Sequence, residues 1–202
     1  MTMTIVLASG NAGKLREIRA ALTAVQAADL HLPCAAELGA PAADEPHGTF
    51  LENALAKART VAAYTGLAAL SDDSGLVVPA LSGAPGVHSA RYADHDANDD
   101  TNNKKLLGAM RDVADRRAFY YAAMVYAAAA DDPAPVFAEG FWRGEIITEP
   151  RGNGGFGYDP LFFDPTVGKT GAQMTAEEKN RVSHRGLALR RLLRLLKRRK
   201  IL

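Results

Sequence analysis

Short apolar runs alternate along the chain with longer segments whose apolar residues recur at helical spacing. The first pair lies at the N-terminus, where the β-branched run Thr4–Ser9 precedes the helical pattern of Lys14–Ala28. The apolar positions of that pattern are Leu15, Ile18, Leu22 and Val25. Between the two segments, Gly10–Gly13 is typical of a turn. The chain is therefore predicted to open with a strand, a glycine-rich turn and a helix.

The same alternation continues towards the C-terminus. Further helices are predicted at Thr49–Tyr64, at Asp99–Val113 and from Thr175 onward, the first and last opening with capping boxes. Further strands are predicted at Leu67–Leu70, Leu76–Leu81, Phe119–Ala130, Val136–Ile147 and Leu161–Phe163. The two long strands would form a hairpin that turns at Asp131–Pro133. The segment Pro33–Gly48 is predicted to be a loop, and the whole pattern indicates an α/β fold.

Length and composition favour one globular domain over residues 1–202. The chain has 202 residues, 48% of them hydrophobic and 23% charged, which is close to the average of folded proteins. Cys34 is the single cysteine, so no internal disulfide can form and a reducing compartment is expected. Neither a signal peptide nor an apolar run of ~18 residues is present, so we expect a cytoplasmic protein without a membrane partner.

The net charge of +1 conceals a basic C-terminus on an acidic body. Residues 185–200 contain eight basic side chains and no acidic one, which leaves −7 on the rest of the chain. Such a segment is typical either of a nucleic-acid or membrane contact or of a terminal helix with one solvated face. Leucines at helical spacing run through the segment and favour the terminal helix.

The turn Ser9–Lys14 is the first candidate for chemistry. A helix that starts here would offer unpaired backbone N–H groups, a positive dipole end and the Lys14 charge, which together favour an anion. Two residues separate its glycines and Leu15 follows the lysine, so it is not a Walker A loop. The alternative is an ordinary turn with a surface lysine.

Adjacent carboxylates follow the predicted strand Leu67–Leu70. Burying the carboxylates of Asp72 and Asp73 beside an apolar strand costs free energy unless a cation or hydrogen-bond donors contact them. Beside a phosphate site, such oxygen ligands suggest Mg²⁺, with Glu45 as a further ligand. The alternative is that Asp72 or Ser74 merely caps a turn and that Glu45 is a surface residue.

Two further segments could contact a ligand. The glycines of 152–157 would let the backbone approach closely, and Phe156 among them offers a stacking face. Otherwise Phe156 packs inward in a glycine-rich connection. On the last predicted helix, Lys179 and Ser183 share a face, with His184 and Arg185 just beyond. Taken alone, His184 fits a surface or helix-packing residue.

Six motifs in order and spacing make the chain resemble the inosine triphosphate pyrophosphatase family, from about Ile5 to Leu195. They are SGNAGK (9–14), T-F-x-E-N-A-x-x-K-A (49–58), DDSGL (72–76), GAPGVHSARY (83–92), GGFGYDPLF (154–162) and E-K-N-R-V-S-H-R-G-x-A-L (178–189). Ser9 stands where many relatives have threonine, and the loop Asp44–His47 departs from the family's usual residues.

The resemblance implies an elongated, two-lobed mixed sheet flanked by helices, with the active site in the central cleft, and a homodimer. It implies hydrolysis of ITP, dITP and XTP to the monophosphate and pyrophosphate with Mg²⁺, which cleanses the nucleotide pool. Asp73 would be catalytic, and Asp73 and Glu45 would bind the metal. The substrate-binding residues would be Ser9, Gly10, Asn11, Ala12, Gly13, Lys14, Ser74, Phe156, Gly157, Tyr158, Asp159, Lys179, His184 and Arg185. Lys57 and Asp72 match motif positions near the phosphates.

Two other functions compete with this one. A nucleotide phosphotransferase is disfavoured by the spacing of the first glycine-rich turn. A nucleic-acid-binding module would use the arginine-rich C-terminus. Deletion of Lys197–Leu202 would abolish binding to DNA or RNA if this were the function. Triphosphate hydrolysis would persist after the same deletion if the chain were a pyrophosphatase. We expect a purine nucleoside triphosphate as the partner and no nucleic acid.

Overall fold

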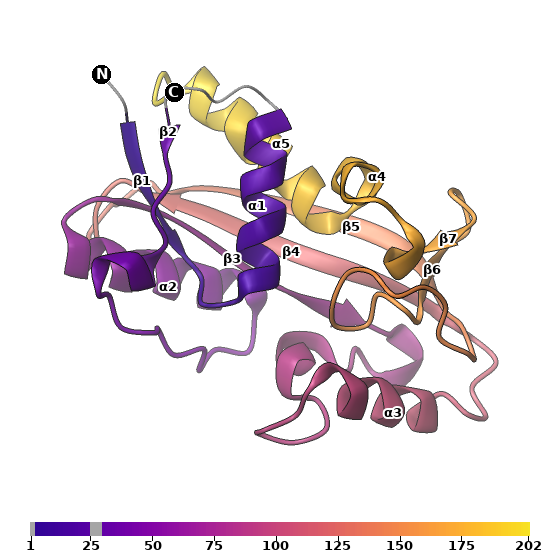
Figure 1. Cartoon of the computed structure of the whole chain (residues 1–202). Helices are drawn as coiled ribbons and strands as arrows, with labels where there is room; N and C mark the ends of the chain where they lie inside the picture. Colours follow the sequence, from indigo (N-terminus) through magenta and orange to yellow (C-terminus); the bar gives the residue numbers. More distant parts are fainter. Residues whose placement is uncertain (1–2, 25–29) are drawn as a thin grey trace. The chain divides into compact units, whose positions relative to one another are not determined.

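The computed structural model describes residues 3–24 and 30–202 (Figure 1). Its helices and strands are β1 (Met3–Ala8), α1 (Ala12–Ala24), β2 (Leu30–His31), α2 (Phe50–Thr65), β3 (Ala68–Val77), α3 (Asp99–Ala109), β4 (Arg117–Ala127), β5 (Val136–Ile146), β6 (Phe162–Asp164), β7 (Lys169–Thr170), α4 (Ala176–Val182) and α5 (His184–Arg198). Short 3-10 helices are η1 (Ala35–Leu38), η2 (Pro79–Leu81), η3 (Gly86–Arg91) and η4 (Gly171–Gln173). None of the described helices is long and apolar enough to cross a membrane.

The strands that the structure describes form a mixed sheet in the order β2-β1-β3-β4-β5-β6-β7. Strand β1 is parallel to β2 and β3, whereas β5–β6 and β6–β7 are antiparallel. In the β1–β3 register, Ala8 lies opposite Ser71. The turn after β1 therefore begins beside the acidic pair of β3, at the edge where ligand sites of parallel sheets lie.

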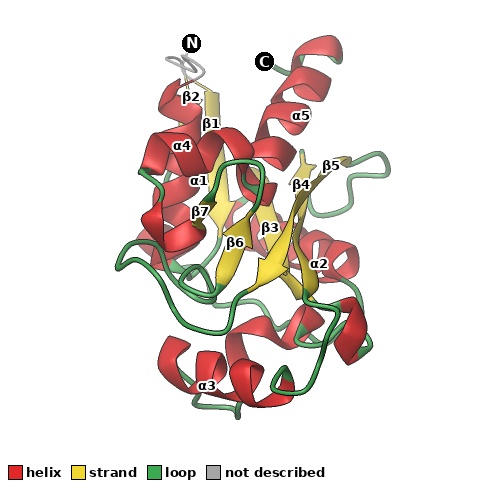
Figure 2. Cartoon of the chain, turned by 90° about the vertical axis from the view of Figure 1, so that its right-hand side faces the viewer, coloured by secondary structure: helices red, strands yellow, loops and turns green. Residues whose placement is uncertain are grey.

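The chain divides into two compact units. The first comprises Met1–Asp73, Ala122–Gly140 and His184–Leu202, and the second comprises Ser74–Tyr121 and Phe141–Ser183. Strands β3, β4 and β5 contribute residues to both units; β4 and β5 form the predicted hairpin, which Figure 2 shows with its connecting loop.

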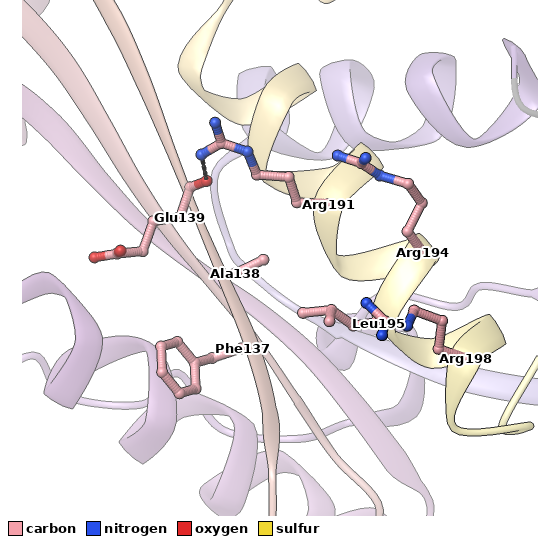
Figure 3. A pocket seen from close by; sticks show the side chains of 7 residues that line it. All are labelled: Phe137, Ala138, Glu139, Arg191, Arg194, Leu195 and Arg198. Carbon is pink, nitrogen blue, oxygen red and sulfur yellow. Dashed lines mark hydrogen bonds between the residues drawn. The ribbon is translucent and has the colours of Figure 1, made fainter.

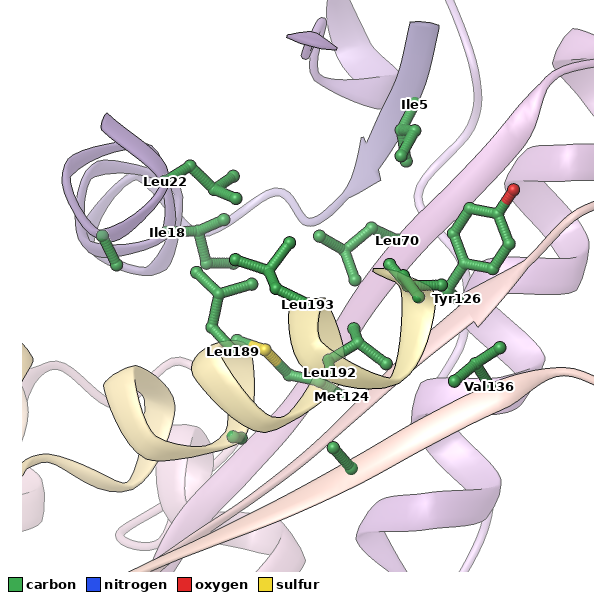
Figure 4. Close-up of a cluster of buried hydrophobic side chains, with 14 of the residues drawn as sticks. Ile5, Ile18, Leu22, Leu70, Met124, Tyr126, Val136, Leu189, Leu192 and Leu193 are labelled. Carbon is green, nitrogen blue, oxygen red and sulfur yellow. The ribbon is translucent and has the colours of Figure 1, made fainter. Parts of the chain in front are cut away.

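The core of the first unit lies between the sheet and helices α1 and α5. Strand residues such as Ile5 and Leu70 pack in one cluster with Ile18 of α1 and Leu192 of α5 (Figure 4). The leucine spacing of the C-terminal segment thus buries one stripe, as predicted. On the other face, the Ser71 hydroxyl donates to the Ala54 carbonyl of α2 at 2.6 Å. Because side chains alternate along a strand, Asp73 is expected on the α2 face and Asp72 on the face of α1 and α5.

The core of the second unit is built around aromatic rings. Tyr120 stacks on Trp142 at 5.8 Å between centroids, and both pack on Phe162 at 4.7 Å. Leu106 of α3 and Met110, which follows the helix, are fully buried in the same cluster. The aromatic residues of the first hairpin strand therefore belong to a sheet, and the choice of strand over helix was right.

Strand β3 corrects one sequence prediction. The sequence predicted a strand that ends at Leu70 and a second strand at Leu76–Leu81, but Ala68–Val77 is one strand. The strand continues through Asp72 and Asp73 because both carboxylates meet cationic side chains there. The second predicted strand ends early because Pro79 opens the 3-10 helix η2.

The C-terminal helix is also divided where one helix was predicted. Helix α4 ends at Val182, Ser183 is extended (φ −69°, ψ 154°), and α5 starts at His184. Serine is strongly preferred immediately before a helix, which is the local signal that the apolar periodicity concealed. The Thr175 capping box is confirmed. Thr49 caps α2 as predicted, but the Glu52 carboxylate accepts from the Thr49 hydroxyl at 2.6 Å and does not complete the predicted capping box.

Other boundaries shift by a few residues. Helix α1 begins at Ala12 rather than Lys14, and its predicted continuation to Ala28 lies outside the described residues. Helix α3 ends at Ala109 instead of Val113. The predicted loop Pro33–Gly48 contains the 3-10 helix η1, with the buried Cys34 just before it.

Candidate active site

The turn between β1 and α1 brings a lysine to the acidic pair. The Asn11 side chain caps the helix by accepting from the Lys14 N–H at 3.1 Å, and the Ser9 hydroxyl accepts from the Asn11 N–H at 3.3 Å. Lys14 Nζ lies 3.5 Å from Asp72 Oδ2 and 3.9 Å from Asp73 Oδ1. Gly10, Asn11 and Ala12 are exposed, so this helix N-terminus is open to an anion.

Asp73 faces α2, from which Lys57 and Asn53 contact it. Lys57 Nζ lies 3.2 Å from Asp73 Oδ1 and 2.5 Å from Glu45 Oε1, so one ammonium joins the two carboxylates. Asn53 Nδ2 donates to Asp73 Oδ2 at 3.3 Å and also bonds the backbone of His47. Helix α2 therefore orients the carboxylate and the loop that carries Glu45.

Asp72 faces the opposite side of β3 and is paired from α5. Arg185 Nε lies 3.2 Å from Asp72 Oδ2, and the same guanidinium forms an ion pair with Glu17 of α1. The side chains of Asp72 and Arg185 are 0% and 4% exposed. This buried network ties α1, β3 and α5 together directly beneath the turn that carries Lys14.

The two aspartates have opposite proton affinities. Burial raises the pKa of Asp73, and nearby Glu45 and Asp72 add to that effect against the pull of Lys57 and Lys14. Burial would also raise the pKa of Asp72, but Lys14, Arg185 and Lys57 together hold it far below its usual value. The pKa of Lys57 is raised, because its three carboxylate neighbours outweigh its burial. Asp72 thus acts as a fixed charge, and Asp73 is the better proton acceptor.

The candidate metal ligands do not form a complete protein cage. Among the described residues, no group of three or more His, Cys, Asp and Glu is placed to hold a metal ion. Glu45 and Asp73 nevertheless converge on the single Nζ of Lys57, so their oxygens point towards a common cation. Two carboxylates completed by substrate oxygens are a donor set that suits Mg²⁺.

In the second unit, Asp159 organises the glycine-rich loop. Its Oδ2 accepts from the Phe156 N–H at 2.8 Å and forms an ion pair with Lys179. A Cβ on Gly155 would lie 2.1 Å from that oxygen, and Gly155 has φ +73°, so the position requires glycine. Lys179 Nζ lies 4.9 Å from the Phe156 ring centroid, within cation–π range.

The structure groups the predicted residues into two sets. Lys14, Glu45, Lys57, Asp72, Asp73 and Arg185 meet in the first unit, and Phe156, Asp159 and Lys179 meet in the second. His184 is buried at the start of α5, and Ser74 is half-buried directly after Asp73.

Sequence reasoning missed Asn53 and Glu17 as members of the first set. Both lie one helical turn from a predicted site residue, Asn53 before Lys57 and Glu17 after Lys14. That spacing could have pointed to them, because residues three or four apart share a helix face.

The arginine-rich face of α5 lines a separate groove. Figure 3 shows Arg191, Arg194 and Arg198 on the helix beside β5, in a cavity of about 440 Å³. Arg191 donates to the Glu139 carbonyl at 2.7 Å. None of the predicted site residues lines this groove. Arg191, Arg194 and Arg198 lie on the exposed face of α5.

Comparisons with known proteins identify the relatives of this chain. Residues 5–195 match the model of the Ham1 family. The dITP/XTP pyrophosphatase of Nitrosomonas europaea is 55% identical over 95% of this chain and 93% of its own length. The solved HAM1 protein of Coxiella burnetii has a TM-score of 0.88 and 43% identity, covering 97% of this chain and 99% of that one. The Mycobacterium abscessus structure, titled a nucleoside-triphosphatase and dITP/XTP pyrophosphatase, has a TM-score of 0.73 and 39% identity, covering 95% and 99% of the two chains. The chain described here belongs to the Ham1 family.

Proposed function

We propose that this chain hydrolyses deaminated purine nucleoside triphosphates (ITP, dITP and XTP) to the monophosphate and pyrophosphate. The observation that carries the proposal is Asp73, a buried carboxylate of raised pKa that lies between Lys14 and Lys57, next to an open helix N-terminus. The names of the relatives support the same substrates. The whole chain, residues 1–202, would act as one catalytic domain, in keeping with the family match over 5–195.

The reaction follows from the charges at this site. Asp73 accepts a proton from a water molecule whose oxygen attacks the α-phosphorus. The bond between that phosphorus and the oxygen bridging to the β-phosphorus breaks, and pyrophosphate leaves with the electron pair. Lys14 and the first turn of α1 stabilise the charge that develops on the leaving group. Asp72 keeps Lys14 in place through their ion pair at 3.5 Å.

We propose Mg²⁺ as the metal that Glu45 and Asp73 hold together with phosphate oxygens. Their shared contact with Lys57 supports this choice, because it shows that the two carboxylates converge. When bound, Mg²⁺ neutralises phosphate charge. We also propose a homodimer in the cytoplasm, on the basis of the motif resemblance and the single cysteine.

A substrate panel tests the proposal. Pyrophosphate release should be much faster from ITP, dITP and XTP than from ATP and GTP in Mg²⁺. A site that hydrogen-bonds the O6 and N1–H edge can reject adenine by ~10⁴-fold, because mismatched polar groups are left unpaired. Equal rates for ITP and ATP would contradict the proposed specificity.

Lys14→Ala should weaken binding of the triphosphate far more than binding of the monophosphate. Lys14 lies at the turn proposed for the phosphate chain, so its charge acts on the β- and γ-phosphates. Dissociation constants of IMP and of a non-hydrolysable ITP analogue measure the effect, and the ITP/ATP ratio of kcat/KM should be unchanged. Arg16→Ala, an exposed change on the same helix, is the control. An equal loss for both ligands would show that Lys14 does not meet the phosphate chain.

Phe156→Ala should raise KM for every purine triphosphate by a similar factor. Stacking on a ring is indifferent to the base's edge and contributes about 1–3 kcal/mol. The measurement is kcat/KM for ITP and ATP, whose ratio should stay nearly constant. Phe137→Ala removes an exposed ring elsewhere in the chain and serves as the control. A changed ratio would show that Phe156 reads base identity.

A further inference from the structure

Helix α3 hydrogen-bonds both the N–H and the carbonyl of Gly157, in the glycine-rich loop that carries Phe156. The Gly157 N–H donates to Asp99 Oδ2 at 2.6 Å, and the Gly157 carbonyl accepts from Asn103 Nδ2 at 2.9 Å. Asp99 and Asn103 lie one helical turn apart at the start of α3, so they share a face. All three residues belong to the second unit.

Gly157 has a backbone conformation that needs such support. Its φ is +63°, in the left-handed region, although a Cβ there would meet no atom within 4 Å. The conformation, and not crowding, is therefore the reason for glycine at this position. Phe156 directly precedes it, so the direction of the Phe156 ring depends on this turn of the backbone.

The hydrogen bond that Asn103 donates to Gly157 is accompanied by an unsatisfied oxygen on the same side chain, among the described residues. Its Nδ2 donates to the carbonyls of both Asp99 and Gly157, which fixes the orientation of the amide. Its Oδ1 is then buried without a hydrogen-bond partner among the residues that the structure describes. Buried acceptors are rarely left unpaired, so this exception needs a reason beyond packing.

We propose that Asp99 and Asn103 are positioning residues that present the Phe156 ring to the purine base. Asp159 holds the loop from the Phe156 N–H, and α3 holds it from both sides of Gly157. The loop is thus set before substrate arrives, and no binding free energy is spent on ordering it. This inference rests on the stacking role proposed above for Phe156.

Asp99→Ala tests the proposal, with Asp100→Ala as a matched control. Both aspartates lie in the first turn of α3 and interact alike with its dipole, but Asp99 bonds Gly157. We expect Asp99→Ala to raise KM for ITP about tenfold, with kcat within about threefold, since it removes one charged hydrogen bond. Asp100→Ala should leave both constants unchanged. Asp99→Asn, which keeps an acceptor oxygen, should restore most of the affinity, and Asn103→Ala should reproduce the rise in KM.

A double variant separates positioning from general damage. If Asp99 acts through the ring, Asp99→Ala adds no further rise in KM to Phe156→Ala. Thermal unfolding and Trp142 fluorescence, which report on the second unit's core, should match those of the Asp100→Ala protein. The positioning role is overturned if Asp99→Ala and Asn103→Ala leave KM unchanged while Phe156→Ala raises it, or if the effects of Asp99→Ala and Phe156→Ala are additive. If Phe156→Ala itself leaves KM unchanged, the stacking role fails and the positioning role fails with it.

Discussion

Asp73→Asn should abolish turnover while the protein remains folded. The amide has nearly the shape of the carboxylate but only one acceptor oxygen, so it can accept from Lys57 or from Asn53 and loses the other hydrogen bond without a change of fold. It cannot take a proton from water, and it is a weaker ligand for a divalent cation. A general base contributes ~10²–10⁴-fold, and kcat for ITP should fall by at least about 100-fold.

The measurement is steady-state pyrophosphate release, with thermal unfolding as the check on folding. Asp44→Asn, an exposed change beside Glu45, should keep full activity. An Asp73→Asn enzyme that kept more than about a tenth of the wild-type kcat at the same Mg²⁺ dependence would refute the assignment.

Arg185→Met should produce the largest loss of stability in the chain. The change leaves the carboxylates of Asp72 and Glu17 without the cation that they share, and Asp72 is fully buried. Breaking a buried pair typically costs about 3–5 kcal/mol, and urea unfolding should show a loss of that size.

Arg181→Met is the control, because its ion pair with Glu177 is exposed. An exposed pair contributes about 0–1 kcal/mol. Adding Asp72→Asn to Arg185→Met should recover part of the stability, since it removes a buried carboxylate that has lost Arg185 and keeps its ion pair with Lys14. Equal free energies of unfolding for the Arg181 and Arg185 variants would contradict the network. The ITP/ATP ratio of kcat/KM does not depend on how much of a variant is folded, so this ratio tests separately whether Arg185 recognises the base. If it does, the ratio should be smaller for Arg185→Met than for the wild-type enzyme.

Much of this architecture could be predicted from local patterns. The capped starts of α2 and α4, the alternating hairpin and the leucine stripe of α5 each follow from residues close in sequence. Ser9–Lys14 and the acidic pair could be singled out as candidates for the same reason, because turn glycines and adjacent carboxylates are themselves local signals.

What sequence reasoning missed depends on contacts between distant residues. Strand β3 runs through Asp72 because Arg185, 113 positions away, neutralises it, and local polarity argued for a strand end. The Lys57 link between Glu45 and Asp73 likewise joins a loop, a helix and a strand. The division at Ser183 is the exception, because serine before a helix is a local signal, but the apolar pattern that continues from α4 into α5 concealed it.

Hydrolysis of ITP in ¹⁸O-labelled water tests the central claim most directly. Attack on the α-phosphorus places the water oxygen in the product IMP and leaves pyrophosphate unlabelled. Mass spectrometry of the two products should therefore find one ¹⁸O per IMP formed in a single turnover. Label in pyrophosphate would mean attack on the β-phosphorus, and formation of IDP with phosphate would mean cleavage at the terminal bond. Either result would contradict a site in which Asp73 activates water for attack on the α-phosphorus.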